Sequence, residues 1–375
     1  MRDEFTIFKL EFYQEYLHML LERVSRLFEK IIACRTTGSI IETAFEFFTG
    51  MQNDGEKPNL KRLDVDKGLF ISFQQGNDIN SSNNLLLGIR IDDLTLKRKK
   101  PRWKDAKTCL KGEHVIKSFI IAECLCWLET IMLTGQSIPL GIFLYDITIN
   151  PPKLMDILAE CGLDESLVLL LEPTSNTPCM VEKGYSRTII KGDPSDLATI
   201  KRNLEENFSP SHPIYPVDMK NPLSFRFLPG AEYATITSNN DSFSMQIHHQ
   251  PFQVGYKQNV FDWLENAGIS KKNIIENIYF QGARFNPNHE IFSIFEDSYE
   301  KVFSKKPYLE WHPNPSFASI LHKSHPETCT IIIGPGNPFL KGSRKERLEK
   351  KDADAFHDFL ATILAKFGPI STLSF

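Results

Sequence analysis

The stretch that decides the fold is LLLGIRIDDL, residues 85–94, together with CLKGEHVIKSFIIAECLCWL, residues 109–128. The first begins as a short apolar run typical of a buried strand, and the second carries apolar residues at helical spacing. Another short apolar run, Leu140–Tyr145, follows the helical stretch. Strand, long helix and strand in this order predict a parallel β-α-β unit.

The same alternation of apolar runs and helical patterns continues on both sides of this unit. Predicted helices cover residues 10–32, 40–51, 113–133, 152–161, 287–303 and 352–367, and predicted strands cover residues 69–73, 85–91, 140–145, 167–171 and 330–333. This rhythm predicts an α/β fold with a mostly parallel sheet and helices on both of its faces.

The pattern changes between residue 183 and residue 284. We interpret this region as a smaller α+β module inserted into the α/β domain. It combines strand-like alternation at 187–190, 234–238 and 243–248 with helical patterns at 195–208 and 260–267. The predicted domain boundaries are 1–183 for the first part of the α/β domain, 184–286 for the insertion and 287–375 for the second part.

Length and composition limit the class of protein. A chain of 375 residues predicts two domains, and a net charge of −4 argues against nucleic acid or an anionic membrane as a partner. Seven cysteines, several of them in apolar stretches, favour reduced thiols. There is no signal-peptide pattern and no apolar run long enough to span a bilayer, so we expect a cytoplasmic protein. The charge run Lys345–Lys351 is interpreted as a solvated helix start.

Several segments, in chain order, resemble motifs of the dinuclear zinc amidohydrolases that include acetylornithine deacetylase and succinyl-diaminopimelate desuccinylase. These enzymes belong to the zinc-dependent aminoacylase and carboxypeptidase superfamily. Residues 85–94 resemble the strand that ends in H-x-D, and residues 109–128 resemble D-M-K-G-G with its long helix. LLLEPTSN (169–176) is similar to G-E-P-T-S. RFLPGAEYATI (226–236) and MQIHHQP (245–251) are similar to the lid segment of the family. IIIGPGNPFLKGSRKER (331–347) is similar to the G-P-G loop that comes before the last ligand histidine and a following glutamate.

The resemblance implies a catalytic α/β domain with an inserted lid that often mediates dimerisation. We therefore expect residues 184–286 to act as a lid through which a homodimer forms. In this family two zinc ions lower the pKa of a bridging water and polarise the scissile amide carbonyl. Histidine nitrogens and carboxylate oxygens at fixed positions hold those ions.

At the positions that match the first zinc ligands, most side chains are different. The histidine of H-x-D is Arg90, whose guanidinium has no lone pair to give to a metal, while its partner Asp92 is retained. The bridging aspartate aligns with Cys109, or with Asp105 in a shifted register. Glu172 keeps the carboxylate of E-P-T.

The later ligand positions differ too. The glutamate pair of the family, one the general base and the other a ligand, falls at Ile147 and Thr148, although a shift of one residue would offer Asp146. The final ligand histidine aligns with Gly342, which has no side chain. The standard two-zinc mechanism is therefore predicted to be absent.

The lid segment has lost its charged pair as well. The substrate-binding arginine of the lid aligns with His248, and the aspartate that accompanies it aligns with Gln246. Adjacent residues on a strand point to opposite faces, so at most one of His248 and His249 faces the cleft. We predict no catalytic and no metal-binding residue. The predicted ligand-binding residues are Arg90, Asp92, Glu172 and His248.

Two functions from different classes remain as hypotheses. The first is a non-hydrolytic family member without a cofactor, which binds a small carboxylate, an amino-acid derivative or a partner protein; Arg90, Asp92 and Glu172 then form a salt-bridged cluster. The second is a zinc amidohydrolase acting on N-acyl amino acids through a reorganised site. Its candidate ligands are Asp92, Cys109, Asp146 and Glu172.

Overall fold

The computed structural model describes most of the chain. The described residues are 23–34, 36–49, 59–63, 68–72, 84–91, 103–105, 108–133, 139–146, 151–159, 163, 166–182, 184–193, 195, 197–198, 202, 231–238, 242–249, 262, 265, 269–285, 288–308, 310–312, 316–338, 340 and 345–367. Their contacts group the chain into two compact units. The first comprises Met1–Cys179, Asn286–Leu309 and Ser324–Phe375, and the second comprises Met180–Phe285 and Glu310–Lys323.

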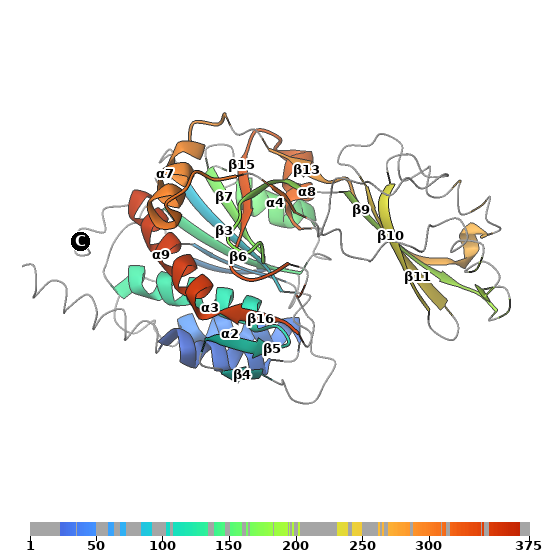
Figure 1. The fold of residues 1–375 in the computed structure, drawn as a ribbon, viewed down its shortest axis with the longest axis horizontal. Helices are drawn as coiled ribbons and strands as arrows, with labels where there is room; N and C mark the ends of the chain where they lie inside the picture. The colour runs from blue at the N-terminus through green and yellow to red at the C-terminus, as the bar shows by residue number, and fades with distance from the viewer. Residues whose placement is uncertain are drawn as a thin grey trace, which may run out of the picture. The chain divides into compact units, whose positions relative to one another are not determined.

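Four parallel strands form the centre of the large sheet. They are β3 (Asn84–Arg90), β6 (Leu140–Tyr145), β7 (Ser166–Leu171) and β15 (Cys329–Ile333), and they lie side by side in the order β6-β3-β7-β15 (Figure 1). Almost every residue in them is buried, which is why their sequences read as continuous apolar runs. The predicted β-α-β unit of β3, helix and β6 is confirmed.

Antiparallel strands extend the sheet at both edges. On one side, β2 (Gly68–Ser72) pairs with β6, and β1 (Asn59–Leu63) pairs with β2. On the other side lie β8 (Cys179–Glu182), β13 (Ala283–Arg284) and β14 (Glu310–His312). The prediction of a large, mostly parallel sheet therefore holds for its centre.

The crossovers place helices on both faces of the sheet. Helix α3 (Val115–Leu133) connects β3 to β6, and α4 (Pro151–Ala159) connects β6 back across β3 to β7. Because such crossovers are right-handed, connections that run in opposite directions put their helices on opposite faces. The remaining described helices include α2 (Thr37–Thr49), α7 (Phe292–Phe303), α8 (Ala318–Ser324) and α9 (Lys350–Phe367).

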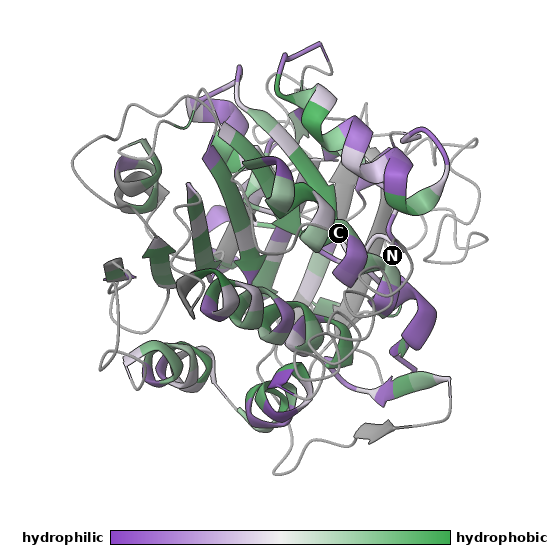
Figure 2. Cartoon of the chain, turned by 90° about the vertical axis from the view of Figure 1, so that its left-hand side faces the viewer, coloured by the Kyte–Doolittle hydropathy of each residue, from purple (hydrophilic) through white to green (hydrophobic). Residues whose placement is uncertain are grey.

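Helix α3 is buried all round. Its residues from Val115 to Ile131 are shielded from solvent, and the helix packs against α9 and against a small sheet of β16 (Arg347–Glu349), β5 (Cys109–Gly112) and β4 (Trp103–Asp105). Figure 2 shows hydrophobic colour concentrated on the central strands and inner helix faces. The run Lys345–Lys351, expected to start a solvated helix, ends in the exposed first residues of α9 but also contains β16 and the buried Glu346.

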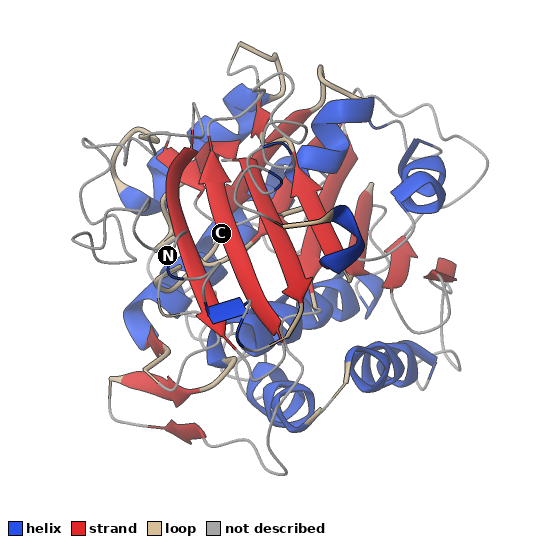
Figure 3. Ribbon diagram, turned by 90° about the vertical axis from the view of Figure 1, so that its right-hand side faces the viewer, coloured by secondary structure: helices blue, strands red, loops and turns tan. Residues whose placement is uncertain are grey.

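The second unit contains a four-stranded antiparallel sheet, seen face-on in Figure 3. Its strands are β9 (Gly184–Lys191), β10 (Ala231–Ser238), β11 (Ser242–His249) and β12 (Ile274–Phe280), in the order β10-β11-β9-β12. Strands expected at 187–190, 234–238 and 243–248 are present. The helices expected at 195–208 and 260–267 lie mostly outside the described residues, and the boundaries at 183/184 and 286/287 stay a prediction. None of the described helices is both long and apolar enough to cross a membrane.

Candidate functional site

The sheet topology marks one place where a ligand site is expected. In the sheet, β6 lies on one side of β3 and β7 lies on the other. The chain runs from β3 to β6 and then crosses back over β3 to β7, so the direction of the connections reverses beside β3. In open α/β sheets, ligands bind outside the carboxyl ends of strands at such a point. Arg90 is the last residue of β3, Asp146 follows β6, and Glu172 follows β7. Three residues singled out by the sequence therefore come together at this edge.

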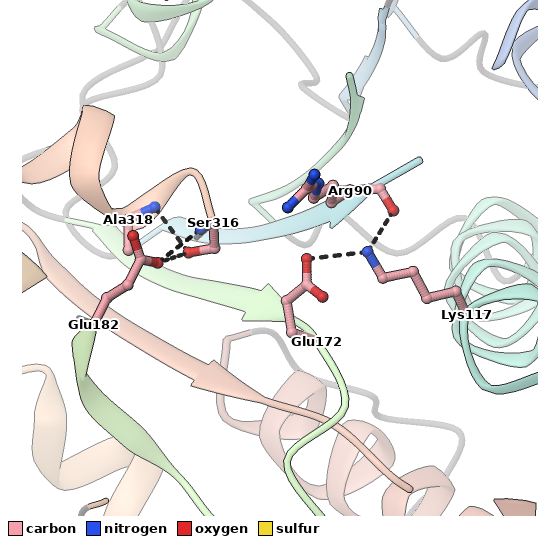
Figure 4. Close-up of polar contacts among 6 residues, drawn as sticks. All are labelled: Arg90, Lys117, Glu172, Glu182, Ser316 and Ala318. Atoms are coloured by element: carbon pink, nitrogen blue, oxygen red, sulfur yellow. Dashed lines mark hydrogen bonds and ion pairs between the residues drawn. The ribbon is translucent and has the colours of Figure 1, made fainter. Parts of the chain in front are cut away.

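A buried ion pair lies at these strand ends. The Lys117 ammonium, in the first turn of α3, lies 3.1 Å from Glu172 Oε1, and the two side chains are only 3% and 1% exposed. The same Nζ donates a hydrogen bond of 2.9 Å to the backbone carbonyl oxygen of Arg90. Figure 4 shows the ammonium between these two oxygens. Lysine is almost never fully buried unless it is paired, and here both contacts offset its desolvation.

Lys117 was missed by the sequence analysis, which expected Arg90 to form a salt-bridged cluster with Asp92 and Glu172. Arg90 is half-buried and contributes its backbone carbonyl to the ammonium, whereas Asp92 lies outside the described residues. The available signal was Lys117 itself, a cation in the first turn of a predicted helix whose sequence is mostly apolar.

The other predicted positions are spread over different elements. Cys109 is buried in β5, where it pairs with Glu349 of β16, and Asp146 is half-buried at the end of β6. Ile147, Thr148 and Gly342 lie outside the described residues. In the second unit, the backbone of His248 pairs with Tyr185 and that of Gln246 pairs with Arg187.

Two loops, residues 172–176 and residues 334–336, are hydrogen-bonded to each other next to Glu172. Backbone N–H groups of Thr174 and Asn176 donate to the Gly334 carbonyl at 3.1 and 2.8 Å, and the Gly334 N–H donates back to Thr174 Oγ1 at 3.1 Å. The Ser175 N–H donates to the Gly336 carbonyl at 2.7 Å. These bonds hold the E-P-T-S segment against the G-P-G segment and fix the backbone from which the Glu172 carboxylate projects.

The close approach of the loops explains both glycines. A Cβ on Gly334 would lie 2.5 Å from the Glu172 carbonyl oxygen. Gly336 has φ +80°, and a Cβ there would lie 2.5 Å from Ile116 Cδ1. On the opposite loop, Ser175 and Asn176 both have positive φ, at 56° and 58°. Such strained residues persist only where the surroundings hold them in place, which marks this region as closely constrained.

Glu346 completes the start of α3, next to Lys117. Its Oε1 accepts the Ile116 N–H at 2.9 Å and its Oε2 accepts the His114 N–H at 3.2 Å. The carboxylate is buried and satisfies backbone donors that have no partner within a helix. His114, with φ +64°, lies just before the helix. Glu346 therefore has a structural role in this chain.

A second buried polar cluster joins α3 to α9. His357 Nδ1 of α9 makes a short contact with Glu123 Oε1 of α3, and the same oxygen accepts the Trp127 indole N–H at 2.9 Å. The rings of Trp127 and His357 lie 5.1 Å apart. Burial raises the pKa of the neighbouring Cys124 and Cys126 thiols, and the Glu123 charge adds to the effect. These thiols are therefore protonated and inert near neutral pH.

The described residues do not fit a two-zinc centre. Zinc needs ligands with available lone pairs, whereas this strand edge presents the Arg90 guanidinium, the Lys117 ammonium and a Glu172 carboxylate already paired with that ammonium. Among the residues that the structure describes, no three histidine, cysteine, aspartate or glutamate side chains gather closely enough to hold a metal ion.

Comparisons with known proteins bear on the fold. No protein-family model matches the sequence, and no curated protein matches it. Solved structures do match over nearly the whole chain. A metallo-carboxypeptidase of the M20 family from Sulfolobus solfataricus has a TM-score of 0.59 at 13% identity, covering 92% of this chain and 98% of its own. Human carnosine dipeptidase 1 has a TM-score of 0.67 at 10% identity, covering 94% and 98%.

A dinuclear metal-binding peptidase of the M20 family from Bacillus subtilis also matches, with a TM-score of 0.52 at 10% identity over 93% of this chain and 98% of its own. At these identities the likeness establishes a shared fold. This chain therefore has the mixed α/β fold of M20-family metallopeptidases, in agreement with the α/β fold class that the sequence predicted.

Proposed function

We propose that this protein is a non-hydrolytic member of the acetylornithine deacetylase-like metallopeptidases. The observation that carries the proposal is the buried ion pair between Lys117 and Glu172. The only zinc-ligand carboxylate of the motifs that survives clearly in the sequence is paired with a cation from the chain itself. A carboxylate in this pairing has less electron density to offer a metal, and a neighbouring positive charge repels metal ions.

The missing ligands support the same conclusion. Hydrolysis in this family depends on metal-bound water, whose pKa falls towards 7 only when zinc is held by several donors. Arg90 replaces one histidine and, by sequence alignment, Gly342 replaces another. Without such ligands, water at this strand edge keeps its ordinary low nucleophilicity.

A small carboxylate is the ligand class that we propose for the site. Arg90 ends β3 at the strand edge where ligands bind in this type of fold, and a guanidinium can hold a carboxylate through two parallel hydrogen bonds. An N-acyl amino acid or a related anion should then raise the melting temperature of the protein through mass action on the folded state. Arg90→Ala should remove that shift, and a shift that persists in the variant contradicts this assignment.

Metal analysis and activity assays test the non-hydrolytic proposal directly. Protein purified without added metal should contain no stoichiometric zinc and should not hydrolyse a panel of N-acyl amino acids and dipeptides. The alternative is an active zinc amidohydrolase with Asp92, Cys109, Asp146 and Glu172 as ligands; the names of the M20-family structural neighbours favour it. Stoichiometric zinc together with turnover that Glu172→Ala abolishes would establish that alternative.

A further inference from the structure

Lys117 supplies a positive charge directly beside the Glu172 carboxylate. Its Nζ lies 3.1 Å from Glu172 Oε1 and 2.9 Å from the Arg90 carbonyl oxygen. Both side chains of the pair are buried, so water screens their attraction little. A cation that approached Glu172 Oε1 would have to displace the ammonium from both oxygens.

The surroundings of α3 keep the ammonium at this position. Glu346 holds the first N–H groups of the helix, and Gly336 packs so closely on Ile116 that a Cβ would lie 2.5 Å from its Cδ1. Lys117 is the next residue along the helix. A close-packed interior leaves its stem little room to withdraw the charge from Glu172.

We propose that the Lys117 ammonium is a built-in counter-ion of Glu172 that excludes metal cations from this site. The inference rests on the proposed non-hydrolytic function and extends it, because it assigns the exclusion of metal to a charge supplied by the chain, in addition to the replaced ligands. A divalent ion beside an ammonium meets like-charge repulsion, which is strong where the surroundings are buried.

The test compares zinc binding by the full-length protein and three variants, measured by isothermal titration calorimetry and by thermal shift with zinc chloride. Lys117→Met removes the charge and keeps an unbranched stem. Its zinc affinity should exceed that of the wild type at least about tenfold, equivalent to about 1.4 kcal/mol of removed repulsion. Lys117→Arg keeps the charge and should resemble the wild type. The double variant Lys117→Met/Glu172→Gln also lacks the Glu172 carboxylate and should lose the gain in zinc affinity.

Equal zinc affinity in the wild type and Lys117→Met overturns the inference, as does an undiminished gain in the double variant. If Lys117→Met cannot be recovered as folded protein from metal-free medium, the same variant is expressed with added zinc, and the yield of folded protein tests the inference. Folded protein obtained only with zinc supports the inference, and failure under both conditions overturns it. If the wild type is inactive and metal-free, and Lys117→Met binds zinc no more tightly than the wild type, this inference is contradicted but the proposed function is not. If the wild type contains zinc and is active, both are contradicted.

Discussion

The Lys117 ammonium lies at the strand edge between the Glu172 carboxylate and the backbone carbonyl of Arg90. Lys117 and Glu172 neutralise each other out of contact with water, and the Arg90 carbonyl accepts a second hydrogen bond from the ammonium. Removing one partner of such a pair leaves an uncompensated buried charge, which costs far more than the intact pair contributes. The stability of the protein should therefore respond strongly to changes at either residue.

In metal-free buffer, Lys117→Met should lower the free energy of unfolding by about 3–5 kcal/mol, because Glu172 loses its counter-charge. Urea denaturation followed by circular dichroism measures this change. Adding Glu172→Gln should restore a large part of the stability, since the amide carries no charge. A single variant as stable as the wild type would show that the pair is not buried as described.

His357 makes stability depend on pH. Burial lowers the pKa of His357, but the charge and hydrogen bond of Glu123, with smaller contributions from Asp358 and Asp354, raise it by more. The pKa of His357 in the folded protein is thus above its ordinary value of about 6.5. Its contribution is fully present below that value and is lost as the pH rises through the folded-state pKa.

His357→Gln should remove this part of the pH dependence. The urea midpoint of the wild type should fall relative to that of the variant as the pH rises above about 6.5, because the imidazolium beside Glu123 loses its proton. Comparing the two proteins at each pH cancels the contributions of the other titrating groups, to the extent that these do not interact with His357. Parallel midpoint curves across this range would rule out a charged His357 in the folded state.

At the level of single residues, sequence reasoning found one half of the central ion pair. The E-P-T-S motif identified Glu172, but its partner lies 55 positions earlier, and a lysine in a helical pattern ordinarily belongs to a solvated face. The pairing depends on how α3 is seated against β3 and β7, which no local pattern encodes. The same applies to Glu346, read as part of an exposed charge run.

Helix α3 depends on a carboxylate supplied from elsewhere in the chain. Glu346 accepts N–H groups of both His114 and Ile116. Glu346→Ala should lower the free energy of unfolding by about 2 kcal/mol, as expected for the loss of a strong helix cap. Chemical denaturation measures it. Lys351→Ala, at a nearby exposed position, is the matched control and should change stability by less than about 0.5 kcal/mol.

At the level of elements, sequence patterns located the long pieces well. Strand β6 was predicted with its observed bounds, and the ends of β3, β7 and α3 were predicted within two residues. The missed strands include β4, β5 and β16, which have three or four residues each and show no clear period of two. Short strands of this kind form because a neighbouring segment offers backbone partners, and the sequence of one segment does not reveal that partner.

At the scale of the molecule, the second unit needs a segment from beyond the inserted region. Glu182, fully buried, accepts hydrogen bonds from the N–H of Ser316 at 2.9 Å and from the Ser316 hydroxyl at short range (Figure 4). The hydroxyl of Ser319 also donates to it, at 2.7 Å. Both serines belong to residues 310–323, which group with this unit by their contacts. Without them, the buried Glu182 carboxylate would lose these three hydrogen bonds.

A fragment of residues 180–285 should accordingly fold poorly, whereas the same fragment joined to residues 310–323 through a flexible linker should be more cooperative and more stable. Thermal unfolding by circular dichroism compares the two. Glu182→Ala in the joined fragment should cancel much of the gain, because the serines lose their charged acceptor. Identical unfolding curves for both fragments would show that α8 adds nothing to this unit.

The cap on α3 has a consequence for the order in which the newly made chain acquires its structure. The acceptor of the His114 N–H lies 232 positions later, and the partner of Glu123 lies 234 positions later. The ribosome therefore releases the central helix long before it makes the groups that complete it. A translation product interrupted before Glu346 and His357 would expose that helix without these partners, and such truncated chains should be readily degraded.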